Sequence, residues 1–172
     1  MEMYKWFEKL PDLLAAMGFP AQLVEGPRVL WAMTPERTQK EDAPMMGEMF
    51  LASSLGLTPP EDVDYLQGSV VFMRDILPDQ LESLRAFCTL LNRKITGGYF
   101  SAMEAADGSC FLEYAFSLVL YKEAAAYQNN RLVEVSVDLA EAYLTLSREA
   151  FSGLAQGRMD VTAALERLDQ EA

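Results

Sequence analysis

The stretch LPDQLESLRAFCTLLNRKITGGYFSAMEAADGSCFLEYAFSLV, residues 77–119, decides the fold of this chain. In its first half, apolar residues recur at alternating spacings of four and three, which places them on one face of an α-helix. These residues are Leu77, Leu81, Leu84, Cys88, Leu91 and Ile95, with Phe87 and Leu90 widening the face. Pro78 suits a first helical turn, and Gly97-Gly98 suits a helix end, because glycine readily adopts positive φ. The pattern therefore predicts an amphipathic helix that ends at the two glycines.

The second half of this stretch predicts a β-hairpin. Residues 99–105 and 110–119 are rich in aromatic and apolar side chains, and Asp107-Gly108 between them is a preferred turn dipeptide. One face of the second segment carries Cys110, Leu112, Tyr114, Phe116 and Leu118. Because this apolar strand face closely follows the apolar helix face, we expect the helix to pack across an antiparallel sheet. The predicted fold class is α+β, a twisted antiparallel sheet with helices packed on it.

The chain before this stretch adds a helix and four strands. An apolar helical face predicts an N-terminal helix, and Pro11 predicts that this helix kinks or restarts. The residues of that face are Met3, Phe7, Leu10, Leu14 and Met17. The predicted strands cover residues 21–25, 28–34, 46–55 and 65–76. Gly26-Pro27 joins the first two strands into a hairpin that carries Val29, Trp31 and Met33 on one face, and a charged loop at 34–44 follows.

The chain after the hairpin adds two helices. Residues 120–131 are interpreted as a polar connector, and the segment that follows predicts a long amphipathic helix. Its apolar residues at helical spacing are Leu132, Val135, Leu139, Ala142, Tyr143, Leu146, Ala150 and Leu154. Asp160 can cap the N-terminus of a short last helix. The expected element order is α-β-β-β-β-α-β-β-α.

The chain shows no internal repeat and no linker composition, and its 172 residues fit one domain. We expect a single domain over residues 1–172, with a core at 3–155 and a helical extension at 157–172.

The charge balance limits the possible partners. The sequence holds 14 Lys and Arg against 26 Asp and Glu, which gives a net charge of -12. A phosphate backbone or an anionic membrane surface would repel such a chain, so we expect no nucleic-acid and no membrane partner. The acidity either maintains solubility or attracts basic segments of a partner protein.

Histidine is absent from the sequence. This absence excludes imidazole-based acid and base catalysis, histidine-activated nucleophiles and imidazole metal sites. Cys88 and Cys110 are not spaced for metal or redox chemistry, and we interpret them as buried thiols in a reduced interior. The N-terminus lacks the apolar segment and cleavage site of a secretory signal, so we expect a cytoplasmic protein.

No motif for a chemical reaction is present: there is no phosphate-binding glycine loop, nucleophile elbow, dinucleotide fingerprint or paired-cysteine metal signature. We therefore expect a non-enzyme with no catalytic residue, no cofactor and no metal. Glu61, Asp62 and Asp64 could hold a hard cation through oxygen ligands, but they lack the spacing of a calcium loop. They are interpreted as an acidic surface loop.

One group of residues indicates protein binding. The methionines at 45, 46 and 49 precede an aromatic residue, and methionine side chains adapt to irregular partners. The candidate partner-binding residues are Met45, Met46, Met49, Phe50 and Trp31. Packing in the core is the alternative interpretation for these residues.

The central stretch also resembles a known family. A helix ending Leu90-Leu91-Asn92, followed by Gly97-Gly98-Tyr99-Phe100, Asp107-Gly108, an alternating apolar strand and a long amphipathic helix, is similar to the bacterial YbjN domain family. The resemblance covers roughly residues 3–155 and implies a fold like that of type III secretion chaperones, often dimeric. Members are described as regulators of sensory transduction, and the family has no catalytic residues to carry over.

Three hypotheses follow for function. The leading one is a non-enzymatic protein-binding or chaperone-like regulatory domain of the bacterial cytosol, forming a homodimer and holding a partner segment at a sheet edge or helix groove. The second is a dedicated type III secretion-type chaperone for one effector. The third is a small enzyme that uses carboxylates or a divalent cation.

Overall fold

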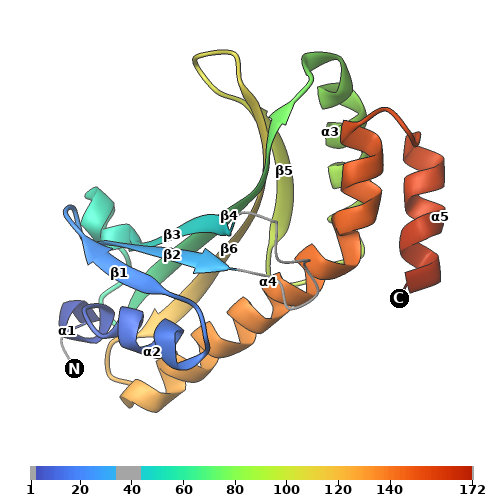
Figure 1. The fold of residues 1–172 in the computed structure, drawn as a ribbon. Helices are drawn as coiled ribbons and strands as arrows, with labels where there is room; N and C mark the ends of the chain where they lie inside the picture. Colours follow the sequence, from blue (N-terminus) through green and yellow to red (C-terminus); the bar gives the residue numbers. More distant parts are fainter. Residues whose placement is uncertain (1–2, 34–43, 172) are drawn as a thin grey trace. The chain divides into compact units, whose positions relative to one another are not determined.

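The computed structural model describes residues 3–33 and 44–171. The described chain forms a six-stranded antiparallel sheet in the order β1-β2-β3-β4-β6-β5, with helices packed on it (Figure 1). The strands are β1 Ala21–Val24, β2 Arg28–Met33, β3 Met45–Leu51, β4 Val63–Ile76, β5 Tyr99–Glu104 and β6 Cys110–Tyr121. The helices are α1 Met3–Phe7, α2 Leu10–Ala16, α3 Leu81–Leu91, α4 Ala126–Ala155 and α5 Val161–Glu171, with short 3-10 turns at Ala52–Leu55 and Pro78–Gln80. The predicted α+β class and element order are confirmed, and the predicted loop at 34–44 lies almost wholly outside the described residues.

The chain divides into two compact units. Unit 1 comprises Met1–Val70 and Phe116–Leu139, and unit 2 comprises Val71–Ala115 and Ala140–Ala172. Strands β4 and β6 and helix α4 each contribute residues to both units. The expectation of one domain stays a prediction.

In unit 1, one face of β2 is buried, as the alternating pattern predicted. Val29, Trp31 and Met33 on β2 are all buried, which confirms the predicted core face of this strand. The N-terminal helix restarts, because α1 ends at Phe7 and α2 begins at Leu10 with Pro11 in its first turn. Proline is tolerated there because the amide it lacks would have no partner within the helix.

Unit 2 has an aromatic core beneath α3. The ring of Phe151 on α4 lies 4.8 Å from that of Phe87, 5.0 Å from that of Phe100 and 5.3 Å from that of Phe72, measured between ring centroids. Most of these contacts are edge-to-face, the arrangement that the aromatic quadrupole favours. The apolar face predicted for α3 points into this core, because Leu84, Phe87 and Cys88 are buried.

Helix α3 is shorter than its apolar spacing predicted. A 3-10 turn at Pro78–Gln80 precedes it, and Leu77 lies outside the helix with 58% of its surface exposed. At the other end the helix stops at Leu91, before the two glycines. The reason is Asn92, whose side-chain amide bonds to the backbone of Phe100 and turns the chain toward β5. Gly97 has a φ of 82° and serves the later turn.

The predicted polar connector is also shorter than expected, because β6 extends to Tyr121 and α4 begins at Ala126. Buried Asn129 explains this: its Oδ1 accepts from the Tyr121 N–H at 3.3 Å, and its Nδ2 donates to the Tyr121 carbonyl at 3.1 Å. Asn130 Oδ1 accepts from Trp6 Nε1 at 2.8 Å. The side chains of Asn129 and Asn130 therefore fix the first turns of α4. The apolar spacing alone predicted that this helix starts later, at Leu132.

The apolar face predicted for α4 was partly wrong. Leu132, Val135 and Leu146 are exposed, whereas Ala150 and Leu154 are buried as predicted. Other buried residues of α4 lie one or two positions after the predicted ones: Val133, Val137, Ala140, Leu144, Ser147 and Phe151. The short last helix is confirmed, because Asp160 Oδ1 accepts from the Ala163 N–H at 2.8 Å, as an N-cap does.

Candidate functional site

Strand β1 of unit 1 lies at one edge of the sheet and pairs only with β2 within the described residues. The Ala32 N–H donates to the Pro20 carbonyl at 2.9 Å, and residues in an antiparallel pair alternate between bonded and non-bonded positions. Gln22 therefore bonds to β2, whereas the N–H and C=O groups of Ala21 and Leu23 point away from the sheet. Among residues 3–33 and 44–171, no group bonds to these outward atoms.

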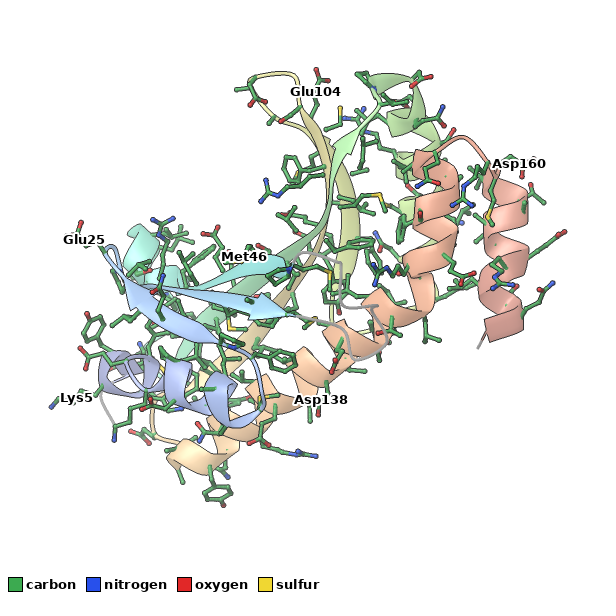
Figure 2. All side chains as sticks on the ribbon, in the orientation of Figure 1. Lys5, Glu25, Met46, Glu104, Asp138 and Asp160 are labelled. Atoms are coloured by element: carbon green, nitrogen blue, oxygen red, sulfur yellow. The ribbon has the colours of Figure 1, made fainter. Side chains whose placement is uncertain are left out.

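A shallow groove of about 230 Å³ lies beside this edge. It is lined by Pro20, Ala21, Gln22, Leu30, Trp31, Ala32 and Met46. Met46 comes from β3, where it pairs across the sheet with Ala32, and its surface is 47% exposed. Figure 2 shows Met46 on the side of β3 opposite α1 and α2, and Glu25 at the tip of the β1–β2 hairpin. Most lining side chains are apolar, so the groove suits an apolar side chain beside an open strand edge.

Trp31 fixes this hairpin to the core of unit 1. Its ring packs edge-to-face on Phe19 at 5.8 Å between centroids, and it lies over Gly47, its cross-strand neighbour. A Cβ at position 47 would sit 2.5 Å from Trp31 Nε1 and 2.4 Å from the Ser69 carbonyl oxygen. Only glycine leaves room for the indole here, so Gly47 sets the position of β2 and hence of β1.

The structure does not bring the predicted partner-binding residues onto one surface. Trp31 is 1% exposed and Met49 is fully buried, so both belong to the core. Met45 and Phe50 are half-buried, and of the five only Met46 is exposed. The spacing of methionines along β3 could not separate these roles, because successive strand residues face opposite sides. Partner binding by Met46 stays a prediction.

In the other edge strand, β5 in unit 2, outward backbone groups bond to side chains of α3 and of the residue that follows it. Asn92 Nδ2 donates to the Phe100 carbonyl at 2.9 Å, and Asn92 Oδ1 accepts from the Phe100 N–H at 2.7 Å. Arg85 Nε donates to the Ala102 carbonyl at 3.3 Å. Phe100 and Ala102 lie two residues apart, so these are the groups that β6 leaves free. The sequence did not predict that Asn92 and Arg85 bond to β5, because neither residue belongs to a periodic pattern.

Burial shapes the chemistry of two groups in unit 2. Desolvation raises the pKa of the Cys88 thiol from 9.0 to about 12, and backbone hydrogen bonds, including one from Ala102, oppose this shift. Desolvation, followed by the charge of Tyr143, raises the pKa of Tyr114 to about 12. Cys88 therefore stays a protonated thiol near neutral pH, as expected for a structural cysteine and unlike a nucleophile.

The acidic loop before β4 does not assemble a cation site in the part of the chain that the structure describes. Asp64 is buried and turns inward, where its Oδ2 accepts from Ser53 Oγ at 2.5 Å and its Oδ1 accepts from the backbone amides of Ser53 and Tyr65. Glu61 and Asp62 are exposed. Asp64 therefore fixes the turn after β3.

Comparisons with known proteins locate the fold. No protein-family model matches the sequence, and no curated protein matches it. The structure is similar to one described as "Crystal structure of YbjN, a putative transcription regulator from E. coli", with a TM-score of 0.52 and 13% sequence identity over 79% of this chain and 86% of that chain. This likeness confirms the YbjN-like fold expected from the central stretch. Among the described helices, none combines the length and apolarity needed to cross a membrane.

Proposed function

We propose that this chain is a non-enzymatic regulatory protein of the cytosol that binds an extended segment of a partner polypeptide at the edge of β1. The single observation that carries the proposal is the open edge of β1 beside an apolar groove. The absence of histidine supports a binding role over imidazole-based catalysis.

Binding occurs by strand addition. Backbone groups of the partner bond to the outward N–H and C=O groups of Ala21 and Leu23, extending the sheet of unit 1 by one strand. Side chains alternate along a strand, so one partner side chain points to the groove face where Met46 and Leu30 lie. Main-chain bonds supply affinity, and the groove selects an apolar residue at one position.

Charge defines the rest of the partner segment. With a net charge of -12, the chain attracts basic segments and repels acidic ones. The partner segment is therefore extended, carries lysine or arginine, and places one apolar residue at the groove. Such steering acts mainly on the association rate and weakens as salt rises.

The test is capture of partners from source-organism lysate by the full chain, identified by mass spectrometry. Leu23→Pro removes an outward N–H, whereas Leu23→Ala removes most of the same side chain and keeps that N–H. We expect the wild type and Leu23→Ala to capture the same polypeptide, and Leu23→Pro to lose it. Absence of any captured polypeptide above background, or equal capture by Leu23→Pro, would contradict the proposal. The oligomeric mass of the same sample tests the proposed homodimer.

A further inference from the structure

A second hollow lies wholly within unit 2, between α3, α4 and α5. Its volume is about 150 Å³. The residues that line it are Leu91, Lys94, Ile95, Phe100, Tyr143, Leu146, Ser147, Leu168 and Asp169. The segment at the end of α3 forms one wall, the middle of α4 another, and the C-terminal end of α5 a third. This hollow is called the α5 pocket below.

The polar groups inside the α5 pocket already have partners. Ser147 Oγ donates to the Tyr143 carbonyl of its own helix at 2.7 Å. The Tyr143 hydroxyl accepts from the Thr96 N–H at 3.2 Å. The remaining interior surface comes from leucine, isoleucine and phenylalanine side chains. A polar ligand would therefore lose hydrogen bonds to water and find few replacements, which disfavours its binding.

The rim of the α5 pocket is electrically balanced. Lys94 Nζ lies 2.5 Å from Asp169 Oδ1, and both side chains reach solvent. An anionic ligand would have to compete with Asp169 for the ammonium group, and a cationic ligand would have to compete with Lys94. The rim therefore favours a neutral ligand.

The volume and lining together define the ligand class. An enclosed cavity of about 150 Å³ lined by leucine, isoleucine and phenylalanine binds benzene. The α5 pocket has a similar volume and a similar apolar interior, but it opens to solvent at the Lys94–Asp169 rim. We propose that the α5 pocket binds a free small molecule that presents one neutral apolar ring. Because Leu168 belongs to α5 and Leu91 to α3, the bound ring holds these two helices together.

The test begins with the wild-type chain and toluene as the probe. Methyl NMR signals of Leu91, Ile95, Leu146 and Leu168 are followed during titration. We expect saturable shifts confined to these methyl groups, and weaker binding of benzoate, whose carboxylate would have to compete with Asp169 for Lys94 or lose its hydration. The absence of saturable shifts up to the solubility of toluene would overturn the proposal.

A matched pair of substitutions on α4 locates the site. Leu146 lines the α5 pocket and is 37% exposed, whereas Leu132 on the same helix is 39% exposed and belongs to unit 1. Leu146→Phe adds volume at the pocket and is expected to weaken toluene binding about tenfold or more, whereas Leu132→Phe leaves it unchanged. Equal weakening by both variants, or none with Leu146→Phe, overturns the proposal. If Leu146→Phe does not fold, Leu168→Ala decides, because an enlarged pocket is expected to prefer naphthalene over toluene.

Discussion

The two edge strands of the sheet differ in whether their outward backbone groups have hydrogen-bond partners. On β5, Arg85 of α3 and Asn92, the residue after α3, bond to the outward backbone groups of Phe100 and to the Ala102 carbonyl, which hinders the addition of a further strand there. On β1, the outward groups of Ala21 and Leu23 meet no partner among the described residues. Unpaired edges promote unwanted association, and proteins commonly cover them or place charges on them. This difference between the two edges, within the described residues, supports the proposal that a partner segment adds at β1.

The sequences of the two strands show the same difference. Strand β1, with the sequence AQLV, contains no charged residue, although lysine and other charges are a common protection of exposed edges. Strand β5 ends in Glu104 and has α3 packed along it. Helix α2 packs against β1 as well, but no side chain of the described residues bonds to the outward groups of Ala21 and Leu23 as Arg85 and Asn92 bond to β5.

The largest expected effect comes from opening the closed edge. Asn92→Ala removes both hydrogen bonds to Phe100 and leaves its N–H and C=O without partners. We expect the free energy of unfolding to fall by about 2–3 kcal/mol, because each unsatisfied buried backbone group is costly. Urea unfolding followed by circular dichroism measures it.

Arg93→Ala is the control for Asn92→Ala. Arg93 is the exposed next residue, and its removal is expected to change stability by less than about 0.5 kcal/mol. Equal stability of the two variants would show that the amide of Asn92 does not close β5.

The next prediction tests which backbone amides of β1 bond to β2 and which point outward. Gln22→Pro removes an amide that bonds to β2, so we expect it to cost about 1–3 kcal/mol of stability. Leu23→Pro removes an amide that points outward, and proline is tolerated on such positions of edge strands. Its cost is expected to stay below about 1 kcal/mol. Thermal and urea unfolding of the two variants side by side make the comparison, and the reverse ranking would show that the register places the wrong groups outside.

Much of the fold could be predicted from the sequence, because its elements follow local periodicity. The faces of β2 and β6 and the N-cap at Asp160 needed only spacing and residue type. The errors occurred where a polar side chain bonds to distant backbone. Asn92 ends α3 early through Phe100, and Asn129 starts α4 early through Tyr121. Such bonds depend on tertiary contacts that no periodic pattern records.

The candidate site was less predictable than the fold. The methionine cluster lies on β3, and only strand pairing shows that Met46 faces the groove while Met49 faces the core. The open edge itself has no sequence signal, since whether β1 is an edge depends on the order of strands in the sheet. The sequence also did not predict the closed edge. Arg85 is an exposed helix residue, and its bond to β5 depends on how α3 packs against that strand.

The pH dependence of stability that comes from Cys88 tests whether α3 buries this thiol against β5. Its pKa is raised from 9.0 to about 12 by burial, so the folded state keeps a proton that the unfolded state releases. This contribution to stability is complete below pH 9.0 and is lost as the pH rises toward about 12. We expect Cys88→Ala to flatten the loss of stability above pH 9.0, measured by urea unfolding at a series of pH values.

Thr89→Ala serves as the control for Cys88→Ala, because Thr89 is the exposed neighbour on α3. It should keep the wild-type slope. A wild-type slope in Cys88→Ala would show that the thiol is open to solvent and that α3 does not seal this part of β5.

The smallest effect concerns Tyr114, which lies opposite Phe100 in the pairing of β5 and β6. Its hydroxyl is buried and has no hydrogen-bond partner among the described residues. Tyr114→Phe removes that unsatisfied group and keeps the ring contact with Phe100, so we expect the free energy of unfolding to rise by up to about 1 kcal/mol. Urea unfolding near neutral pH measures the change. A loss of stability instead would mean that the Tyr114 hydroxyl has a hydrogen-bond partner. A polar group could then be held next to β5, and the contrast between β5 and β1 would be weaker.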